Sequence, residues 1–270
     1  MKFHDPRHEY DRLREQGLTE SDAGWVACRH ADVVEIAQDP DRFSSAVSRF
    51  LQIPNGLDGE EHARMRRLLD PFFAPERMET LEPLLRSVAA DLVAEISRGE
   101  VINAVTEFGA RFAVRAQSQW LGWPSDLEDE LLAWMAANFE ASRSGELTQT
   151  AQVARRFDEI IRSIVEPRLT GSQARHGDVT DELIDVLRNE PDPEATLVSV
   201  LRNWTGGDLG SIALCIGVLV HWLAVHPEHQ DSFRRLSDHE LDQAIDEILR
   251  IDDPFVSNRR RATQDTTVDG

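Results

Sequence analysis

The strongest restriction on the fold comes from an apolar stretch late in the chain. Residues 212–223 are apolar at nearly every position, so a helix formed there is apolar on almost all sides. A helix of this kind is usually buried in the middle of a large protein. Its longest unbroken run is far shorter than the about 20 residues that span a bilayer. The stretch therefore predicts a central buried helix, and no membrane segment.

The rest of the sequence also favours helices. Apolar residues recur at helical spacing, with Pro or Gly at the expected ends. A strand-like run covers 25–28, and its partner strand is not located from the sequence. The segment 170–180 is expected to be a loop, and the tail that ends at 270 favours β-structure. No repeat or linker marks a boundary, so we expect one domain over 1–270, mainly α with small β-sheet elements. The predicted helices are 4–16, 31–38, 62–73, 75–97, 105–121, 126–142, 147–169, 181–188, 194–225 and 237–251.

Composition excludes several classes of protein. The chain has 49 Asp and Glu residues against 29 Lys and Arg, a formal net charge of -20, which argues against a nucleic-acid binder. The only two cysteines, Cys28 and Cys215, lie far apart, which argues against a disulfide framework or a Cys-based zinc site. The N-terminus has no apolar core of a signal peptide. We therefore expect a soluble cytoplasmic protein.

Two basic spots stand out in this acidic chain. His62 and Arg66 are four residues apart, on one face of a helix, and Arg260 lies in a run of three arginines near the end. Guanidinium groups bind carboxylates or phosphates through paired hydrogen bonds, so both spots suggest anion recognition. The alternative is a solvated helix face and a charged strand end.

A second feature precedes the apolar stretch. Gly206, Gly207 and Asp208 are adjacent, although a glycine inside a helix costs roughly 1 kcal/mol relative to alanine. Such a cost is accepted for a kink, a close backbone approach or a site, and the alternative is a packing contact between crossing helices. Further on, Glu247 and Arg250 form a same-face helical pair, a pattern that also occurs by chance.

Taken in this order and spacing, these motifs resemble the cytochrome P450 family. The resemblance covers essentially all 270 residues and includes the early segments 25–34, 39–45 and 178–184. It implies the cytochrome P450 fold and a haem b cofactor. It also implies roles for individual residues: haem-propionate contacts for His62, Arg66 and Arg260, the haem face of the central helix for Gly206 and Gly207, proton delivery for Asp208, and a structural motif for Glu247 and Arg250.

The sequence departs from the family pattern at two points. Leu209 stands where the family usually has a threonine that helps to deliver protons, and leucine has no hydroxyl group. The family's Phe-x-x-Gly-x-x-x-Cys loop, whose thiolate binds the haem iron, is not found, and neither Cys28 nor Cys215 fits it. We therefore expect no metal ligand in this chain, a C-terminally incomplete P450 fold, and the N-terminal two thirds of such an enzyme.

The resemblance implies a haem-thiolate monooxygenase. Such an enzyme inserts one oxygen atom from dioxygen into a small organic substrate, with electrons from a ferredoxin- or flavodoxin-type donor. Segments 46–56 and 135–139 and the helix face near Trp204 are expected to line its pocket. The 270-residue chain is expected to be inactive without the missing region. The alternative is a degenerate, non-catalytic relative that binds a small apolar ligand or another protein.

Overall fold

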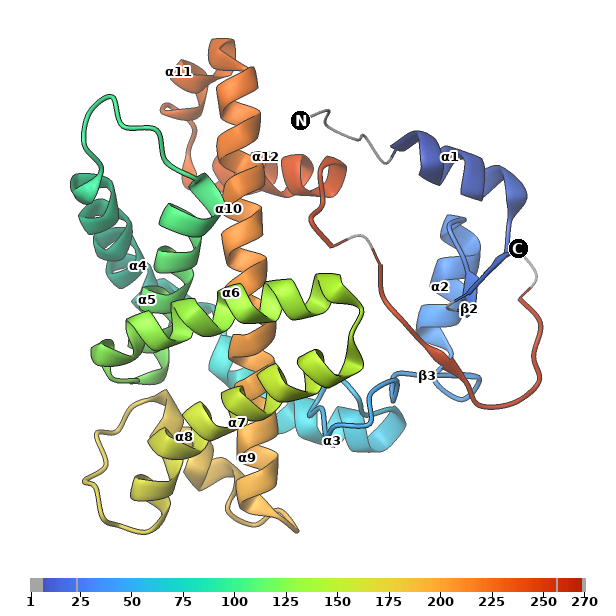
Figure 1. The fold of residues 1–270 in the computed structure, drawn as a ribbon, viewed down its shortest axis with the longest axis horizontal. Helices are drawn as coiled ribbons and strands as arrows, with labels where there is room; N and C mark the ends of the chain where they lie inside the picture. The colour runs from blue at the N-terminus through green and yellow to red at the C-terminus, as the bar shows by residue number, and fades with distance from the viewer. Residues whose placement is uncertain (1–6, 23, 256, 269–270) are drawn as a thin grey trace. The chain divides into compact units, whose positions relative to one another are not determined.

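The computed structural model describes residues 7–22, 24–255 and 257–268 and forms two compact units (Figure 1). Unit 1 combines Met1–Arg66 with Asn258–Gly270, and unit 2 is Arg67–Ser257. Residues 4–6 of the first predicted helix and the last two residues of the predicted β-leaning tail lie outside the described residues. One domain over 1–270 stays a prediction.

Unit 1 contains two short antiparallel strand pairs, one of which joins the two ends of the chain. Its elements are α1 (Arg7–Gln16), β1 (Thr19–Ser21), β2 (Gly24–Val26), α2 (His30–Gln38), β3 (Phe43–Ser44), the first part of α3 (Gly59–Leu69) and β4 (Arg261–Ala262). β1 is the strand partner that the sequence pattern did not locate, and it pairs with β2. In the other pair Phe43 lies opposite Ala262 and Ser44 opposite Arg261, so the start of the C-terminal tail is a strand.

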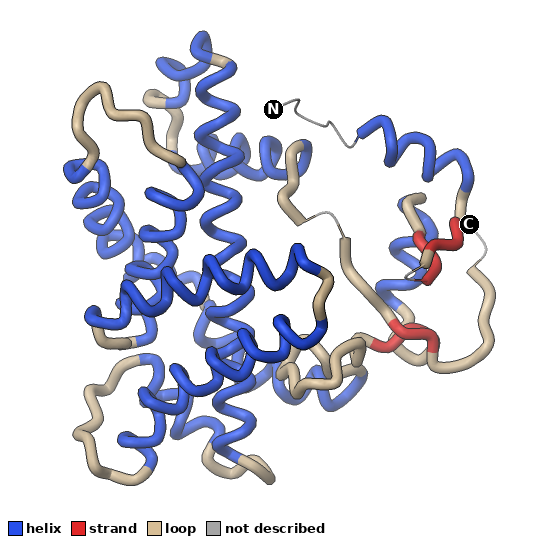
Figure 2. The backbone as a smooth tube through the Cα atoms, in the orientation of Figure 1, coloured by secondary structure: helices blue, strands red, loops and turns tan. Residues whose placement is uncertain are grey.

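Unit 2 is helical throughout its regular structure, and the strands lie in unit 1 (Figure 2). The mainly α fold with small sheets is therefore confirmed. The long helices of unit 2 are α4 (Pro75–Glu95), α5 (Ala110–Leu121), α6 (Glu128–Ser144), α7 (Leu147–Leu169), α8 (Val179–Leu187), α9 (Pro193–Arg202), α10 (Asp208–Val225) and α12 (Asp238–Ile251). Short helical segments join them: η1 (Asp70–Phe73), η2 (Ala104–Gly109), η3 (Ser125–Leu127), η4 (Asn203–Gly207), η5 (Pro227–His229) and α11 (Gln230–Phe233).

The core of unit 2 is built on α5, α7, α8 and α9. Their apolar stripes supply Val114, Leu121, Phe157, Ile161 and Leu201, each no more than 1% exposed. Helix α9 packs against α7 and α8, so its residues 196–201 are all buried. This packing anchors the helical run that continues through η4 into α10.

The predicted burial of the apolar helix is wrong for most of α10. Only Leu209 and Ala213 are buried among its residues, whereas Val220 and Val225 are 44% and 54% exposed. The elements η2 and α5 pack against α10, and α12 packs against it as well, but they leave much of its surface uncovered. The apolar composition of a helix indicates that it favours apolar surroundings. Which of its sides are covered by other elements is decided by the packing of the fold.

This exposed apolar helix also meets a simple length criterion for a membrane span. Over 193–225, an 18-residue window has a mean hydropathy of 1.9, and 11% of that window is buried. Among the described residues, one helix, this one, is long and apolar enough to cross a membrane, judged by length and composition alone. One such helix is weak evidence, because core helices of water-soluble proteins pass the same test.

Two glycines set where α10 crosses its neighbours. A Cβ atom on Gly109, where η2 meets α5, would lie 2.8 Å from the carbonyl oxygen of Ala213 and 3.0 Å from its Cα. On the other side of the contact, a Cβ atom on Gly217 would clash with the side chain of Val105. The backbones therefore approach closely only because neither glycine carries a side chain.

Candidate functional site

The helix that contains the Gly-Gly-Asp motif is interrupted by a π-helical segment. The predicted helix over 194–225 is observed as α9, η4 and α10 in direct succession. At the junction the backbone N–H of Asp208 donates to the carbonyl of Thr205, whereas a regular α-helix would pair it with Trp204. Such π-segments often occur at functional sites.

Side chains supply donors to the carbonyls of this irregular turn. The hydroxyl of Thr205, which is fully buried, donates to the carbonyl of Leu201 at 2.6 Å. The side-chain amide of Gln117, on α5, donates to the carbonyl of Trp204 at 3.1 Å. Each bond gives a buried oxygen a partner, as buried polar groups require.

The two glycines of the motif differ in their surroundings. A Cβ atom on Gly206 would lie 3.1 Å from the ring of Phe157 and 3.3 Å from that of Trp134, so Gly206 makes a packing contact. A Cβ atom on Gly207 or Gly210 would have no neighbour within 4 Å. Since Gly207 is exposed, the start of α10 presents bare backbone with open space beside it.

Asp208 is the titratable group of this segment. Burial raises the pKa of its carboxyl group to about 6, and no charged neighbour in the described residues adds to the shift. A group with a pKa near the working pH both accepts and donates protons readily. Next to it, Leu209 is buried and has no hydroxyl, and the hydroxyl of Ser211 donates to the carbonyl of Gly207 at 2.8 Å. Asp208 is therefore the group in 207–211 with a proton that it can exchange near neutral pH.

The predicted propionate contacts lie in unit 1. His62 is half-buried on α3, Arg66 is exposed one turn later, and Arg260 is half-buried beside β4. One guanidinium nitrogen of Arg260 donates to the carbonyl of Arg259 at 2.9 Å. Although burial acts in the opposite direction, hydrogen bonds from Ser44 and Ser45 and the positive charge of Arg260 lower the pKa of Asp58.

This interaction shows how unit 1 brings distant residues together. Asp58 directly precedes α3, and its carboxylate accepts hydrogen bonds from the Ser44 hydroxyl at 2.5 Å and from the Ser45 backbone at 2.9 Å. Ser44 lies on β3, which pairs with β4. The strand pair therefore places Arg260 within electrostatic reach of the residue that precedes α3.

The Glu247–Arg250 pair forms as predicted. The guanidinium of Arg250 donates to both carboxylate oxygens of Glu247, at 2.7 and 2.8 Å, and both residues are exposed on α12. This bond lowers the pKa of Glu247. The pair faces solvent in this chain, so any structural role depends on what contacts α12.

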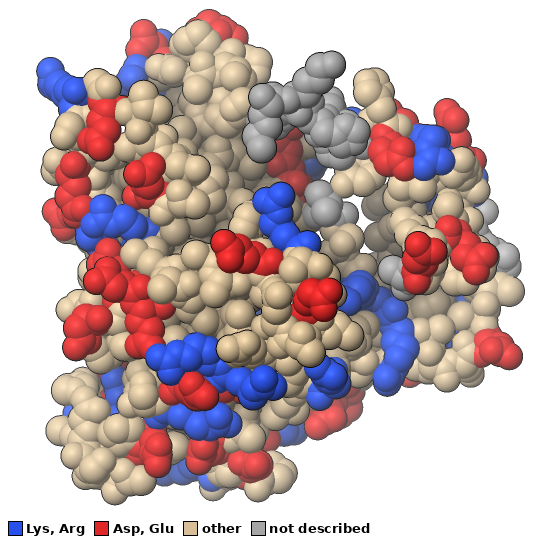
Figure 3. All heavy atoms as spheres, viewed as in Figure 1, with Lys and Arg blue, Asp and Glu red and all other residues tan. Residues whose placement is uncertain are grey.

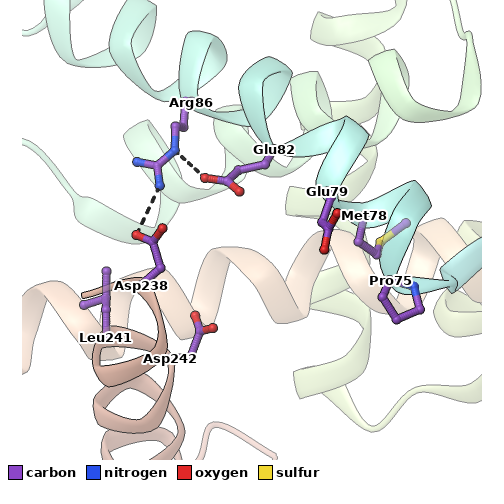
Figure 4. Close-up of a pocket in the computed structure, with 8 residues that line it drawn as sticks. All are labelled: Pro75, Met78, Glu79, Glu82, Arg86, Asp238, Leu241 and Asp242. Atoms are coloured by element: carbon purple, nitrogen blue, oxygen red, sulfur yellow. Dashed lines mark hydrogen bonds and ion pairs between the residues drawn. The ribbon is translucent and has the colours of Figure 1, made fainter. Parts of the chain in front are cut away.

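An open groove of about 500 Å³ lies between α4 and α12 (Figure 4). Glu79, Glu82, Asp238 and Asp242 give it an acidic lining, and Arg86 bonds to Glu82 at 2.6 Å. None of the predicted site residues lines this groove. On the face shown in Figure 3, acidic and basic side chains are intermixed over unit 2 and form no continuous basic patch.

The sequence pattern did not identify the aromatic and amide groups that hold η4. The ring of Trp204 stacks on Trp120 with centroids 5.3 Å apart and meets Phe73 edge-on at 4.8 Å. Gln117 lies on the buried face of α5 among Ala113, Val114 and Leu121. A polar residue at an apolar position of the helical repeat is the signal by which Gln117 stands out.

No obvious metal site is present in the described residues. They contain no group of three or more His, Cys, Asp or Glu side chains that could hold a metal ion. Cys28 and Cys215 are free and half-buried. Burial, with a smaller contribution from Asp253, raises the pKa of the Cys215 thiol, which disfavours the thiolate form that binds metals.

Comparison with known proteins identifies the class to which this fold belongs. No family model matches the sequence. The chain is 26% identical over 260 residues to the erythromycin C-12 hydroxylase of Saccharopolyspora erythraea. The matched region covers 91% of this chain and 64% of that protein. It is also 26% identical over 283 residues to the pulcherriminic acid synthase of Bacillus subtilis, covering 98% and 68%.

Solved structures show the same fold. The open cytochrome P450 EryK of S. erythraea superposes with a TM-score of 0.77 at 23% identity, over 97% of this chain and 69% of that one. The cytochrome P450 260B1 of Sorangium cellulosum superposes with a TM-score of 0.80 at 21% identity, over 97% and 68%. The chain therefore has the cytochrome P450 fold, and the curated proteins that it resembles are bacterial cytochrome P450 enzymes. It spans 64% and 65% of the length of two curated relatives that it matches.

The residues present fit part of a haem group. Haem carries two propionate carboxylates, and in unit 1 the guanidinium groups of Arg66 and Arg260 and the ring N–H of His62 are donors that suit carboxylates. The bare backbone at Gly207 and Gly210 leaves space for a flat ring against α10. An iron ligand is not evident, because Cys215 is on α10 and Cys28 follows the β1–β2 hairpin. Taken separately, unit 1 offers donors that suit the propionates and unit 2 offers open backbone on α10, and neither cysteine lies in the ligand loop of the family.

Proposed function

We propose that this chain forms the N-terminal two thirds of a haem-thiolate monooxygenase that inserts one oxygen atom from dioxygen into a small organic substrate. The observation that carries the proposal is the segment from Thr205 to Asp208. It combines a π-helical break, open backbone at Gly207 and a desolvated carboxyl group. The family relatives supply the context in which such a segment has a catalytic use.

In this proposal the cofactor is haem b. Bound haem would supply the activation of dioxygen. His62, Arg66 and Arg260 would hold its propionates by hydrogen bonds, and the open side of Gly207 would belong to the helix face against which the ring lies. The Cβ side of Gly206 already packs against Phe157 and Trp134, so Gly206 would contribute its backbone alone. Glu247 and Arg250 would act as a structural pair, and the iron ligand would come from residues outside this sequence.

Asp208 would move protons at the site. Its pKa of about 6 allows the carboxyl group to donate a proton and to regain it near neutral pH. Because Leu209 has no hydroxyl, the usual threonine step is absent, and Asp208 would act through water or through a hydroxyl of the substrate. We therefore expect Asp208→Asn to reduce proton delivery more strongly here than in a relative that keeps the threonine.

The substrate and the partners are proposed from the relatives. Two curated relatives are named as hydroxylases of erythromycin at C-12 and of 6-deoxyerythronolide B, both small organic molecules. Segment 46–56 in unit 1 and segment 135–139 in unit 2 would each contact the substrate of this protein. The ring of Trp204 is 5% exposed and packs against Trp120 and Phe73, so it would support the site from behind. Electrons would come from a ferredoxin- or flavodoxin-type donor, and the complete protein would be soluble and cytoplasmic.

Haem binding provides a direct test of the assigned residues. Purified chain is titrated with haemin and the change in its Soret absorption is followed. Arg66→Ala and Arg260→Ala should each weaken binding at least about tenfold, since a charge-assisted bond contributes about 1.5–3 kcal/mol. The matched control is Arg259→Ala, next to Arg260 and exposed. Equal affinities for all three variants would refute the assignment.

The 270-residue chain itself should show no monooxygenase turnover. The measurement is product formation with haem, reductant and dioxygen, with a relative of known activity as the positive control. Product formed by the chain alone would contradict the proposal that the ligand-bearing region is required.

The second candidate is a non-catalytic relative that binds an apolar ligand or another protein. The uncovered apolar surface of α10 favours it, because exposed apolar patches often mark interaction sites. Unfolding of the haem-free chain separates the candidates. A self-sufficient binding module should stay monodisperse and unfold cooperatively, whereas part of a larger enzyme should aggregate through α10.

A further inference from the structure

The π-segment next to Asp208 is held from outside the helix by α5. Gln117 donates from its side-chain amide to the carbonyl of Trp204 at 3.1 Å, a contact between residues 87 positions apart. In a regular α-helix that carbonyl would accept from the N–H of Asp208, which here donates to Thr205 instead. The amide of Gln117 thus gives the Trp204 carbonyl a donor from outside the helix, where the N–H of Asp208 is turned to Thr205.

The geometry around Gln117 leaves little freedom in this contact. Gln117 is 8% exposed, and its other side-chain atom, Oε1, has no hydrogen-bond partner within the described residues. The bond to Trp204 is therefore the contact that orients the amide. Helix α5 also holds Trp204 through its ring, which stacks on Trp120 three residues after Gln117.

We propose that Gln117 is a positioning residue, which keeps the segment Asn203–Gly207 in its π-helical form and thereby fixes where the Asp208 carboxyl group lies. Without the amide, the buried carbonyl of Trp204 loses its side-chain donor. The nearest replacement is the N–H of Asp208, and restoring that bond makes the turn α-helical. The Asp208 side chain then moves around the helix axis by up to about 100°, the angle that one residue occupies.

The consequence is measurable because the ionisation of Asp208 reports its position. Burial raises its pKa to about 6, so a carboxyl group that moves toward water must titrate at lower pH. The inference rests on the proposed function only for the use of Asp208 in proton delivery. The placement of Asp208 by Gln117 holds in the haem-free chain and is tested there.

The experiment compares the Asp208 carboxyl titration, followed by carbon NMR, in the full chain and in Gln117→Met. Methionine keeps the length of the side chain and removes the donor. We expect the pKa of Asp208 to fall by at least one unit, a tenfold change in its proton affinity. The matched control is Val114→Ala, a buried residue of α5 that should lose stability and leave the pKa unchanged. An unchanged pKa in Gln117→Met, or an equal fall in Val114→Ala, overturns the proposal.

A measurement on the unaltered chain covers the case in which Gln117→Met does not fold. The side-chain amide protons of Gln117 should exchange with solvent far more slowly than those of exposed Gln152 on α7. Equal exchange would show that the bond to Trp204 does not persist, and the proposal would fail. If the haemin titration fails while the pKa of Asp208 shifts as expected, the proposed function falls and the positioning role of Gln117 stands.

Discussion

Arg168 connects three parts of unit 2, and its removal should be among the most damaging single changes. Its side chain is 2% exposed and lies near the end of α7. It donates to both carboxylate oxygens of Asp178 at 2.7 and 2.9 Å, to Asp181 at 3.2 Å, and to the carbonyl of Gly122 at 2.9 Å. The loop between α7 and α8 and the end of α5 are thus held by one guanidinium group.

The cost of Arg168→Met follows from what remains unpaired. Asp181 is 2% exposed and keeps hydrogen bonds from the backbone N–H groups of His176 and Gly177, whereas Asp178 loses its charge partner. Removing one partner from a buried ion pair costs about 3–5 kcal/mol. We expect this loss in the free energy of unfolding, measured by urea denaturation at pH 7 with an unchanged m-value.

A matched control lies on the same helix. Arg162 bonds to Glu194 at 3.3 Å, and both side chains are about half exposed, at 45% and 55%. Arg162→Met should cost less than about 1 kcal/mol, as is usual for surface ion pairs. The comparison separates the effect of burial from the loss of an arginine on α7.

The pH dependence provides a second check. Burial acts to raise the pKa of Asp181, but hydrogen bonds from Gly177 and His176 and the charge of Arg168 outweigh it and lower the pKa. A lowered folded-state pKa contributes stability above the unfolded value, about 3.9, that is lost as the pH falls through the folded value. Below about pH 4 the difference between wild type and Arg168→Met should therefore narrow. A loss under about 1 kcal/mol at pH 7, or a pH-independent difference, would refute the reasoning.

Two further changes test the packing and capping of single helices by urea denaturation. Gly109→Ala should destabilise unit 2 by about 1–3 kcal/mol, because the new Cβ would meet the backbone of Ala213. The control Gly210→Ala, whose Cβ would have no neighbour within 4 Å, should be neutral or stabilising. Equal effects of the two changes would contradict the close approach of Gly109 to Ala213. Ser237→Ala should cost about 1 kcal/mol, because Ser237 and Glu240 form a capping box at the start of α12, and no loss would show that this helix end is not held by its cap.

Local patterns predicted most helices of the chain. The amphipathic stripe of α4 and the apolar repeat of α7 lie within single helices, so their spacing is visible in the sequence. The Glu247–Arg250 pair formed for the same reason, since a separation of three places both side chains on one face. The partner of β2 was not located, because β1 is a three-residue strand without an apolar repeat of its own.

The sequence alone established the helical class, the positions of most helices and the order of the motifs around His62, Gly206 and Glu247. These features depend on residues that are near one another in the chain. Tertiary structure decided which faces of α10 are covered, how the carbonyl of Trp204 is satisfied and why the pKa of Asp208 is raised. Each of these depends on contacts between residues far apart in sequence, and no local spacing specifies which distant side chains will meet.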